Sequence, residues 1–157
     1  MATSSAAATG SSAFTFGFLP PVSEKLGRGN YNMWFAQVSS TIKGAQFGKY
    51  IRPDAVPPAA YLQGDADPAT GKTPDPQPNP AYETWVTQDQ QVLSYLFSSL
   101  SREVFSQVSA ATTASELWAA IQAHHASQSR ARIISTRMAL ATVSKGSSSI
   151  ADYFGKR

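Results

Sequence analysis

The chain has 157 residues with 42% hydrophobic content, a net charge of +3 and no cysteine. This length supports one globular domain with tails, and the lack of cysteine excludes disulfides, thiolate zinc sites and a cysteine nucleophile. No apolar run is long enough to span a bilayer and the N-terminus lacks a secretory pattern, so we expect a cytoplasmic protein with no membrane partner.

The first 30 residues have no helical pattern. Residues 1–13 are small and polar, and we expect disorder there because they can bury too little surface to offset the entropy of ordering. Residues 14–30 begin with FTFGFLPPV, in which aromatic and small residues alternate before two prolines. This pattern predicts an extended arm across the helical core, as a short strand or a docked segment.

The first helix is predicted from Tyr31 to Gly44. Its apolar residues repeat at helical spacing, namely Trp34, Phe35, Val38 and Ile42. A further apolar turn follows at Phe47, Tyr50 and Ile51, and Pro53 halts it.

Residues 53–80 hold every proline except Pro20 and Pro21, together with Gly64, Gly71 and several acidic residues. This composition predicts a flexible surface loop inserted in the domain.

The next helix is predicted from Tyr82 to Leu100, with Asn79 as its cap and Pro80 in its first turn, and we expect it to be the longest. A short helix over 101–108 follows.

The stretch from Thr113 to Val143 is predicted to be a helical hairpin. Thr113 and Glu116 have the spacing of a capping box, which begins a helix whose apolar residues are Leu117, Trp118 and Ile121. A second apolar stripe follows Ala126-Ser127 and consists of Ile133, Ile134, Met138 and Ala141. Gly146 ends the pattern, and a last short helix is predicted from Ser148 or Ser149.

The residues that could support catalysis are sparse. His124 and His125 are adjacent, so they point to different sides of a helix and cannot bind one metal together. The carboxylates are few, several of them lie in the proline-rich loop, and no glycine-rich phosphate loop occurs. We therefore predict no catalytic residue, metal site, cofactor or small-molecule substrate.

Two sets of residues are candidates for function. The first comprises apolar positions expected in the core or in self-association: Tyr31, Trp34, Trp85, Leu117, Trp118 and Ile121. The second comprises Arg130, Arg132 and Arg137, of which two share one side of a helix and the third lies opposite. These arginines either bind the phosphates of RNA or solvate the helix.

Six short blocks, in order, carry a family resemblance. They are Lys25-Leu26 with Gly29-Asn30-Tyr31 and Trp34; Asn79-Pro80-Ala81-Tyr82 with Trp85; Leu100-Ser101 with Glu103-Val104; Thr113-Ala114 with Leu117-Trp118; Ser127-Gln128-Ser129-Arg130-Ala131-Arg132; and Ser149-Ile150-Ala151-Asp152-Tyr153-Phe154. With these blocks the chain resembles the N-terminal Gag region of plant copia-type LTR retrotransposons, from Lys25 to Arg157 apart from the loop.

The resemblance implies a helical capsid domain that self-associates into particles around element RNA, followed by more helices and a zinc knuckle. We therefore expect an all-α fold, a small bundle of about five helices resembling a retroviral capsid N-terminal domain, over residues 31–157. This chain departs from the pattern by ending inside the helix near Ser149 and by lacking the knuckle. The resemblance implies a homo-oligomer or weak dimer. Because the chain is truncated, we expect a monomer or weak dimer and no particle, with a concentration-dependent dimer that buries Ile150, Tyr153 and Phe154.

Three functions follow as hypotheses. The first is a structural, self-associating Gag protein of an element or of a host gene derived from one. The second is an adaptor that binds a host peptide in the groove beside the first helix. The third is RNA binding through the basic helix.

Overall fold

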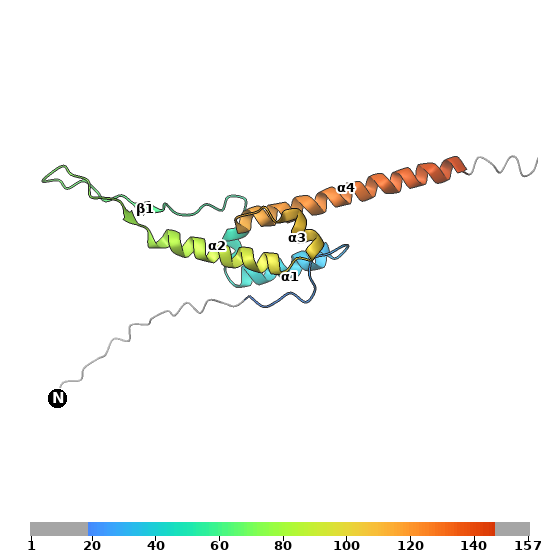
Figure 1. Cartoon of the computed structure of the whole chain (residues 1–157), viewed down its shortest axis with the longest axis horizontal. Coiled ribbons are helices and arrows are strands. Elements are labelled where there is room, and N and C mark those ends of the chain that lie inside the picture. Colours follow the sequence, from blue (N-terminus) through green and yellow to red (C-terminus); the bar gives the residue numbers. More distant parts are fainter. Residues whose placement is uncertain (1–18, 147–157) are drawn as a thin grey trace, which may run out of the picture.

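The computed structural model describes residues 19–146 (Figure 1). Within this range it contains α1 (Tyr31–Gly44), the 3-10 helix η1 (Gly48–Ile51), β1 (Tyr61–Leu62), β2 (Gln77–Pro78), α2 (Pro80–Ser98), α3 (Arg102–Val108) and α4 (Ala114–Gly146). The predicted all-α class is confirmed, because the only strands in these residues form one two-residue ladder. Residues 1–18 and the helix predicted from Ser148 or Ser149 lie outside this description.

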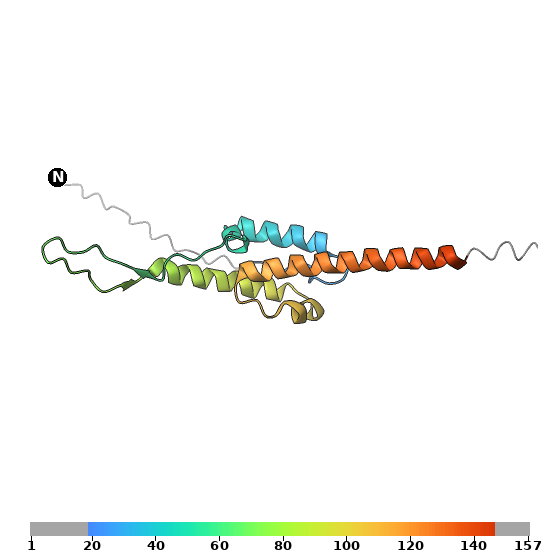
Figure 2. The same cartoon turned by 90° about the horizontal axis from the view of Figure 1, so that it is seen from above.

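The core lies where α1, α2, α3 and the first half of α4 meet. Seen from above, α1 and α3 lie on opposite sides of the α2 and α4 pair (Figure 2). The predicted stripe of α1 is buried through Trp34, Val38 and Ile42, and the helix ends at Gly44 as predicted. Helical spacing on one side of α1 has therefore produced the expected buried face.

The described part of the N-terminal arm packs against this core. Leu19 and Val22 are half-buried against the apolar cluster, and Leu26 is buried within it. The Leu26 backbone N–H donates to the carbonyl oxygen of Ser99 at 2.8 Å, and its own carbonyl accepts from Ser101 N–H at 3.0 Å. These two bonds form a single parallel bridge with the turn after α2, which anchors the arm.

The proline-rich segment is an extended, acidic hairpin, here called the acidic arm (residues 53–79). The sequence predicted only a loop, but Tyr61 pairs with Pro78 and Leu62 with Gln77 in an antiparallel register. At its base, the Asn79 side-chain amide donates to Ala59 O at 2.6 Å, while the Asn79 backbone N–H donates to Ala60 O at 2.9 Å. The arm projects from one end of the domain, and every residue between Tyr61 and Pro78 is exposed (Figure 1).

The start of α2 follows the sequence prediction. Asn79 is the N-cap, its side-chain oxygen accepts from Ala81 N–H at 3.0 Å, and Pro80 occupies the first turn. The predicted short helix is α3, which Ser101 caps. The expectation that α2 would be the longest helix is wrong, because α2 has 19 residues and α4 has 33.

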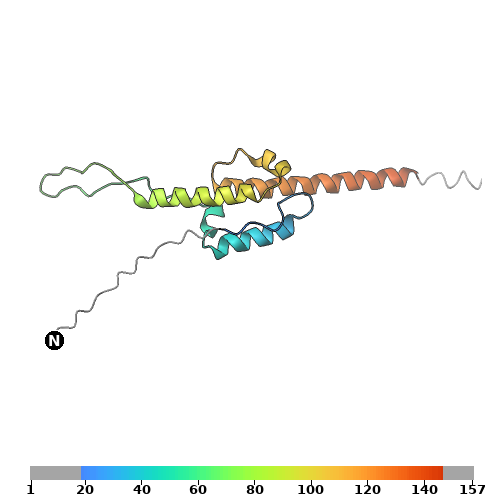
Figure 3. The ribbon, with the colours of Figure 1, turned by 60° about the horizontal axis from the view of Figure 1, so that its bottom comes forward.

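The predicted helical hairpin over Thr113–Val143 is also wrong, since α4 is one continuous helix. The prediction places a break at Ala126 and Ser127, but neither residue stops a helix. The Ser127 hydroxyl instead donates to the carbonyl oxygen of His124 at 2.8 Å, so this polar group has a hydrogen-bond partner within the helix. As a result, the second half of α4 extends beyond the core at the end opposite the acidic arm (Figure 3).

The outer part of the acidic arm should contribute almost nothing to stability. Replacing residues 63–76 with Asn-Gly joins Leu62 to Gln77 through a two-residue hairpin turn and keeps the base of the arm. We expect the free energy of unfolding to change by less than about 1 kcal/mol, because the removed residues are exposed. Circular dichroism during thermal and urea unfolding measures this; loss of cooperative unfolding would contradict the arrangement.

Trp118 should be essential for the fold. Its side chain is buried and its ring lies 5.8 Å from that of Trp34 and 5.2 Å from that of Phe35, between centroids. Trp118→Ala should cost about 3–5 kcal/mol, a large part of a typical total of about 5–15 kcal/mol. The control is Met33→Ala on exposed α1 surface, which should leave the urea midpoint nearly unchanged. Equal midpoints for both variants would contradict the packing described.

Candidate functional site

The N-terminus of α4 is held by a network of side chains. The Thr113 hydroxyl accepts from Glu116 N–H at 3.2 Å, while the Glu116 carboxylate accepts from the backbone N–H groups of Thr112 and Thr113 at 2.8 and 3.3 Å. This is the capping box that the sequence predicted. Ser115 donates to the carbonyl oxygen of Arg52 at 2.7 Å, which ties the same turn to the end of η1.

Asp89 of α2 also binds the start of α4. One carboxylate oxygen accepts from Ala114 N–H at 3.1 Å and the other from the Gln90 amide at 3.2 Å. The residue is only 2% exposed, and burial raises the pKa of its carboxyl above the ordinary value, against the lowering effect of the Ala114 bond. Glu116 shows the opposite shift, because bonds from Thr112 lower the pKa of its carboxyl. The N-terminus of α4 is thus capped by one buried and one exposed carboxylate.

An aromatic cluster joins α1 to the first half of α4. The Trp34 ring N–H donates to the backbone and hydroxyl oxygens of Ser99, both at 3.2 Å, and the ring stacks on Trp118. Tyr31 packs beside Trp34 and stacks on the imidazole of His125, with ring centroids 3.7 Å apart and planes 8° from parallel. The cluster therefore fixes α4 against α1 over several turns.

The six apolar residues proposed from the sequence for the core or for self-association differ in how far they are buried. Trp34, Leu117, Trp118 and Ile121 are buried in the core, whereas Tyr31 and Trp85 are half-buried. Trp85 stands apart from the cluster, since its ring packs edge-on against Tyr50 at 5.0 Å. A fully buried side chain cannot contact a second copy while the fold is intact, so a surface for association has to be found among other residues.

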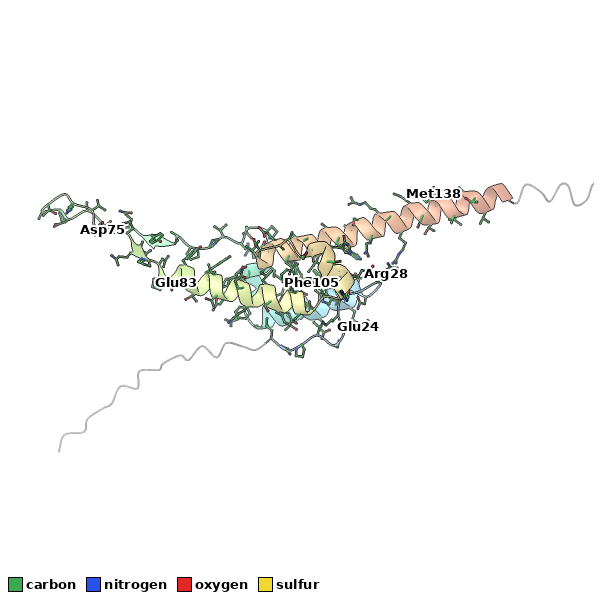
Figure 4. All side chains as sticks on the ribbon, in the orientation of Figure 1. Glu24, Arg28, Asp75, Glu83, Phe105 and Met138 are labelled. Atoms are coloured by element: carbon green, nitrogen blue, oxygen red, sulfur yellow. The ribbon has the colours of Figure 1, made fainter. Side chains whose placement is uncertain are left out.

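The exposed part of α4, residues 130–143, is here called the projecting half of α4. Every side chain in it is exposed, including Arg130, Arg132 and Arg137. Its large apolar side chains are exposed by half or more, namely Ile133, Ile134, Met138, Leu140 and Val143. Figure 4 labels Met138 on this segment, well beyond the packed core. Ile133, Ile134 and Met138 were predicted to form a second packed stripe, and the structure leaves them without the core that a hairpin would supply.

The three arginines differ in their surroundings. Arg130 and Arg137 are seven residues apart and share a side of α4, while Arg132 lies on the other side and lines a small pocket of 170 Å³ with Tyr31, His124 and His125. Among residues 19–146, no carboxylate lies within ion-pair distance of any of the three. All three side chains are exposed on the described surface.

A wider groove of 630 Å³ lies at the base of the acidic arm, between its prolines and the Tyr50 and Trp85 rings. Within the described residues, no group of three His, Asp or Glu side chains could hold a metal ion. Within the same residues, no helix is long and apolar enough to cross a membrane.

Residues 58–155 match the sequence profile of the family described as gag-polypeptide of LTR copia-type. This stretch includes residues 58–79 of the acidic arm, α2, α3 and the whole of α4. The chain belongs to the copia-type gag family.

Two relatives of this gag chain are polyproteins of Arabidopsis thaliana. The retrovirus-related Pol polyprotein from transposon RE1 is 30% identical over 129 residues, which are 82% of this chain and 8% of the relative. The corresponding polyprotein from transposon RE2 is 29% identical over 113 residues, which are 72% of this chain and 7% of the relative. The gag chain therefore spans less than a tenth of either relative, and no solved structure matches it.

Three features of the described residues were not predicted from the sequence. The predicted second stripe does not include Leu140 and Val143. Leu140 lies seven residues after Ile133 and Val143 seven after Thr136, so each shares a side of α4 with the earlier residue. The stacking of His125 on Tyr31 was also missed, because it depends on the crossing of α1 over α4 and no local pattern encodes that crossing. The acidic composition of residues 53–79 could be read from the sequence, but the position of these residues at one end of the domain could not.

The two carboxylates at the start of α4 should give opposite effects of pH on stability. Because the pKa of Asp89 is raised in the folded state, its contribution to the free energy of unfolding is fully present below the ordinary pKa of 3.8. That contribution is lost as pH rises through the folded-state pKa. The lowered pKa of Glu116 means that its contribution is present above 4.5 and is lost on acidification. Asp89→Asn should therefore make stability rise more steeply from pH 3 to pH 7, and Glu116→Gln should make it rise less steeply.

Urea unfolding of both variants and the parent at pH 3, 4, 5, 6 and 7 measures these slopes. Because the two variants neutralise carboxylates at one helix end, each serves as the control for the other. Parallel pH profiles for all three proteins would contradict the assigned environments.

Proposed function

We propose that this chain is a structural, non-enzymatic gag domain of a copia-type retrotransposon, or of a host gene derived from one, and that it self-associates in the cytoplasm. Membership of the gag family supports the structural role. The observation that carries self-association is the projecting half of α4, where Ile133, Ile134 and Met138 are 53%, 58% and 67% exposed.

An exposed apolar surface of this kind favours association. Burial of one large aliphatic side chain is worth about 1.5–3 kcal/mol, and the projecting half carries five of them. Its remaining residues include alanine, serine, threonine and arginine but no acidic side chain, so no local ion pair shields the apolar groups. A partner that covers this surface is more consistent with its composition than permanent exposure to water.

RNA binding by Arg130, Arg132 and Arg137 is the second candidate function. The specific observation in its favour is that, within residues 19–146, the three side chains are exposed and lack carboxylate partners. Binding of RNA should then weaken with salt, and neutralisation of each contacting arginine should lower the salt slope by about 0.7 on single strands.

The adaptor hypothesis receives less support. It requires a host peptide in the place beside α1 where the N-terminal arm would otherwise lie. Leu19 and Val22 of that arm already pack on the core, so a peptide would have to displace them.

Self-association is tested by light scattering after size exclusion and by sedimentation velocity of nuclease-treated protein at 0.15 M salt. We expect the average mass to rise with concentration above that of one 16.8 kDa chain. Ile134→Gln with Met138→Gln should weaken association at least about tenfold, because two apolar contacts are lost.

The matched control is Met33→Gln, which changes a half-exposed apolar residue on α1 and should leave association as in the parent. A constant mass of one chain across all concentrations would refute the proposed function. Association that survives the double change would exclude the projecting half of α4 as its surface.

A further inference from the structure

We propose that the acidic arm of one gag chain docks on the projecting half of α4 of a second copy, so that copies join head to tail. This inference rests on the proposed self-association and adds the partner segment and the geometry. The arm (residues 53–79) is the donor surface, and the α4 side that carries Arg130 and Arg137 is the receiving surface.

The two surfaces carry opposite charge. The acidic arm contains four aspartates and one lysine, which sum to −3, whereas the projecting half of α4 contains three arginines and no acid, which sum to +3. Asp54 already pairs with Arg52 at 2.8 Å, and Asp67 binds the Ala69 and Thr70 groups of its own turn. Asp65 and Asp75 are exposed and have no such local bond, so they are the carboxylates best placed for a partner.

The two surfaces also match in their apolar side chains. On α4, Arg130 and Arg137 lie between an apolar row formed by Ile133 and Leu140 and another formed by Ile134, Met138 and Ala141. The arm alternates its aspartates with prolines and with exposed apolar side chains, of which Tyr61 is 63% and Val56 75% exposed. Each surface therefore presents charged side chains flanked by apolar ones. The aspartates of the arm and the arginines of α4 have opposite charge, so they attract across the contact.

A chain cannot make this contact with itself. The arm leaves the N-terminal end of α2, and the projecting half of α4 leaves the core at the opposite end, in all three views (Figures 1, 2 and 3). Asp75 and Met138, labelled on the two segments, lie at opposite extremes of the described molecule (Figure 4). The attraction between the segments can be satisfied only between copies.

Pairing of like segments is less favourable. Two projecting halves packed together would bring six arginines close with no acid between them, and two arms would bring eight aspartates close against two lysines. Like charges placed opposite each other cost affinity, whereas the head-to-tail contact neutralises both surfaces. Since each copy then has one donor and one receiving surface, the contact is heterologous and extends to a ring or a chain of copies.

Charge reversal with mixing tests the proposal on the whole chain. One variant carries Asp65→Lys and Asp75→Lys on the arm, and the other carries Arg130→Glu and Arg137→Glu on α4. Each alone should associate at least about tenfold more weakly than the parent, because every arm would face an α4 surface of its own sign. Mixed in equal amounts, they should regain association near that of the parent, since both contacts in an alternating assembly attract.

The matched control on the same helix is Arg132→Glu, which lies on the other side of α4 and should change association less than about threefold. Replacement of residues 63–76 with Asn-Gly removes Asp65 and Asp75 while it keeps the base of the arm, and it should weaken association as the charge reversal does. Circular dichroism of each variant shows that it is folded before its association is measured.

The outcomes separate this inference from the proposed function. Parent-like association of both reversed variants would overturn head-to-tail docking and leave self-association standing. Absence of any association in the parent would overturn both. If the variant with Arg130→Glu and Arg137→Glu loses RNA binding but associates like the parent, these arginines bind RNA and the docking proposal is overturned.

Discussion

The helix α4 is longer than the core that it packs against, and the other features of this gag chain depend on that mismatch. Its first turns bury Leu117, Trp118 and Ile121 against α1 and α2, whereas every residue from Arg130 to Val143 is exposed. No glycine or proline interrupts the helix between Ala114 and Lys145, so the backbone continues past the end of its tertiary support. A helix of 33 residues is about 50 Å long at 1.5 Å per residue, which exceeds what a core of this size can cover.

The core separates two projecting segments of opposite charge (Figure 1). The stacked rings of Trp34 and Trp118 set how α4 crosses α1, and Asp89 ties the first turn of α4 to α2. Asn79 fixes the acidic arm to the N-terminal end of α2 through three hydrogen bonds. Because both segments are anchored to the same packed unit, their opposite orientation is a property of the fold, and a contact between them requires two copies.

Much of the fold was predictable because it is encoded locally. The cap at Asn79, the capping box at Thr113 and Glu116, and the buried stripe of α1 each follow from residues within a few positions of one another. The prediction of a helical hairpin over Thr113–Val143 was wrong because the stripe of Ile133, Ile134 and Met138 resembles a packed face. Amphipathic spacing alone does not reveal whether such a face is covered. The pairing of β1 with β2 and the stacking of Tyr31 on His125 join residues distant in sequence, so a local pattern could not predict them.

In the proposed assembly, another copy of the chain covers the projecting half of α4. Hydrogen–deuterium exchange of RNA-free protein, followed from low to high concentration, measures this directly, because an isolated solvent-exposed helix frays and exchanges quickly. We expect the protection of the amides in residues 130–143 and in residues 61–78 to rise together with protein concentration, while the protection of the core amides stays constant. Unchanged protection in both segments while the mass of the protein increases would contradict it.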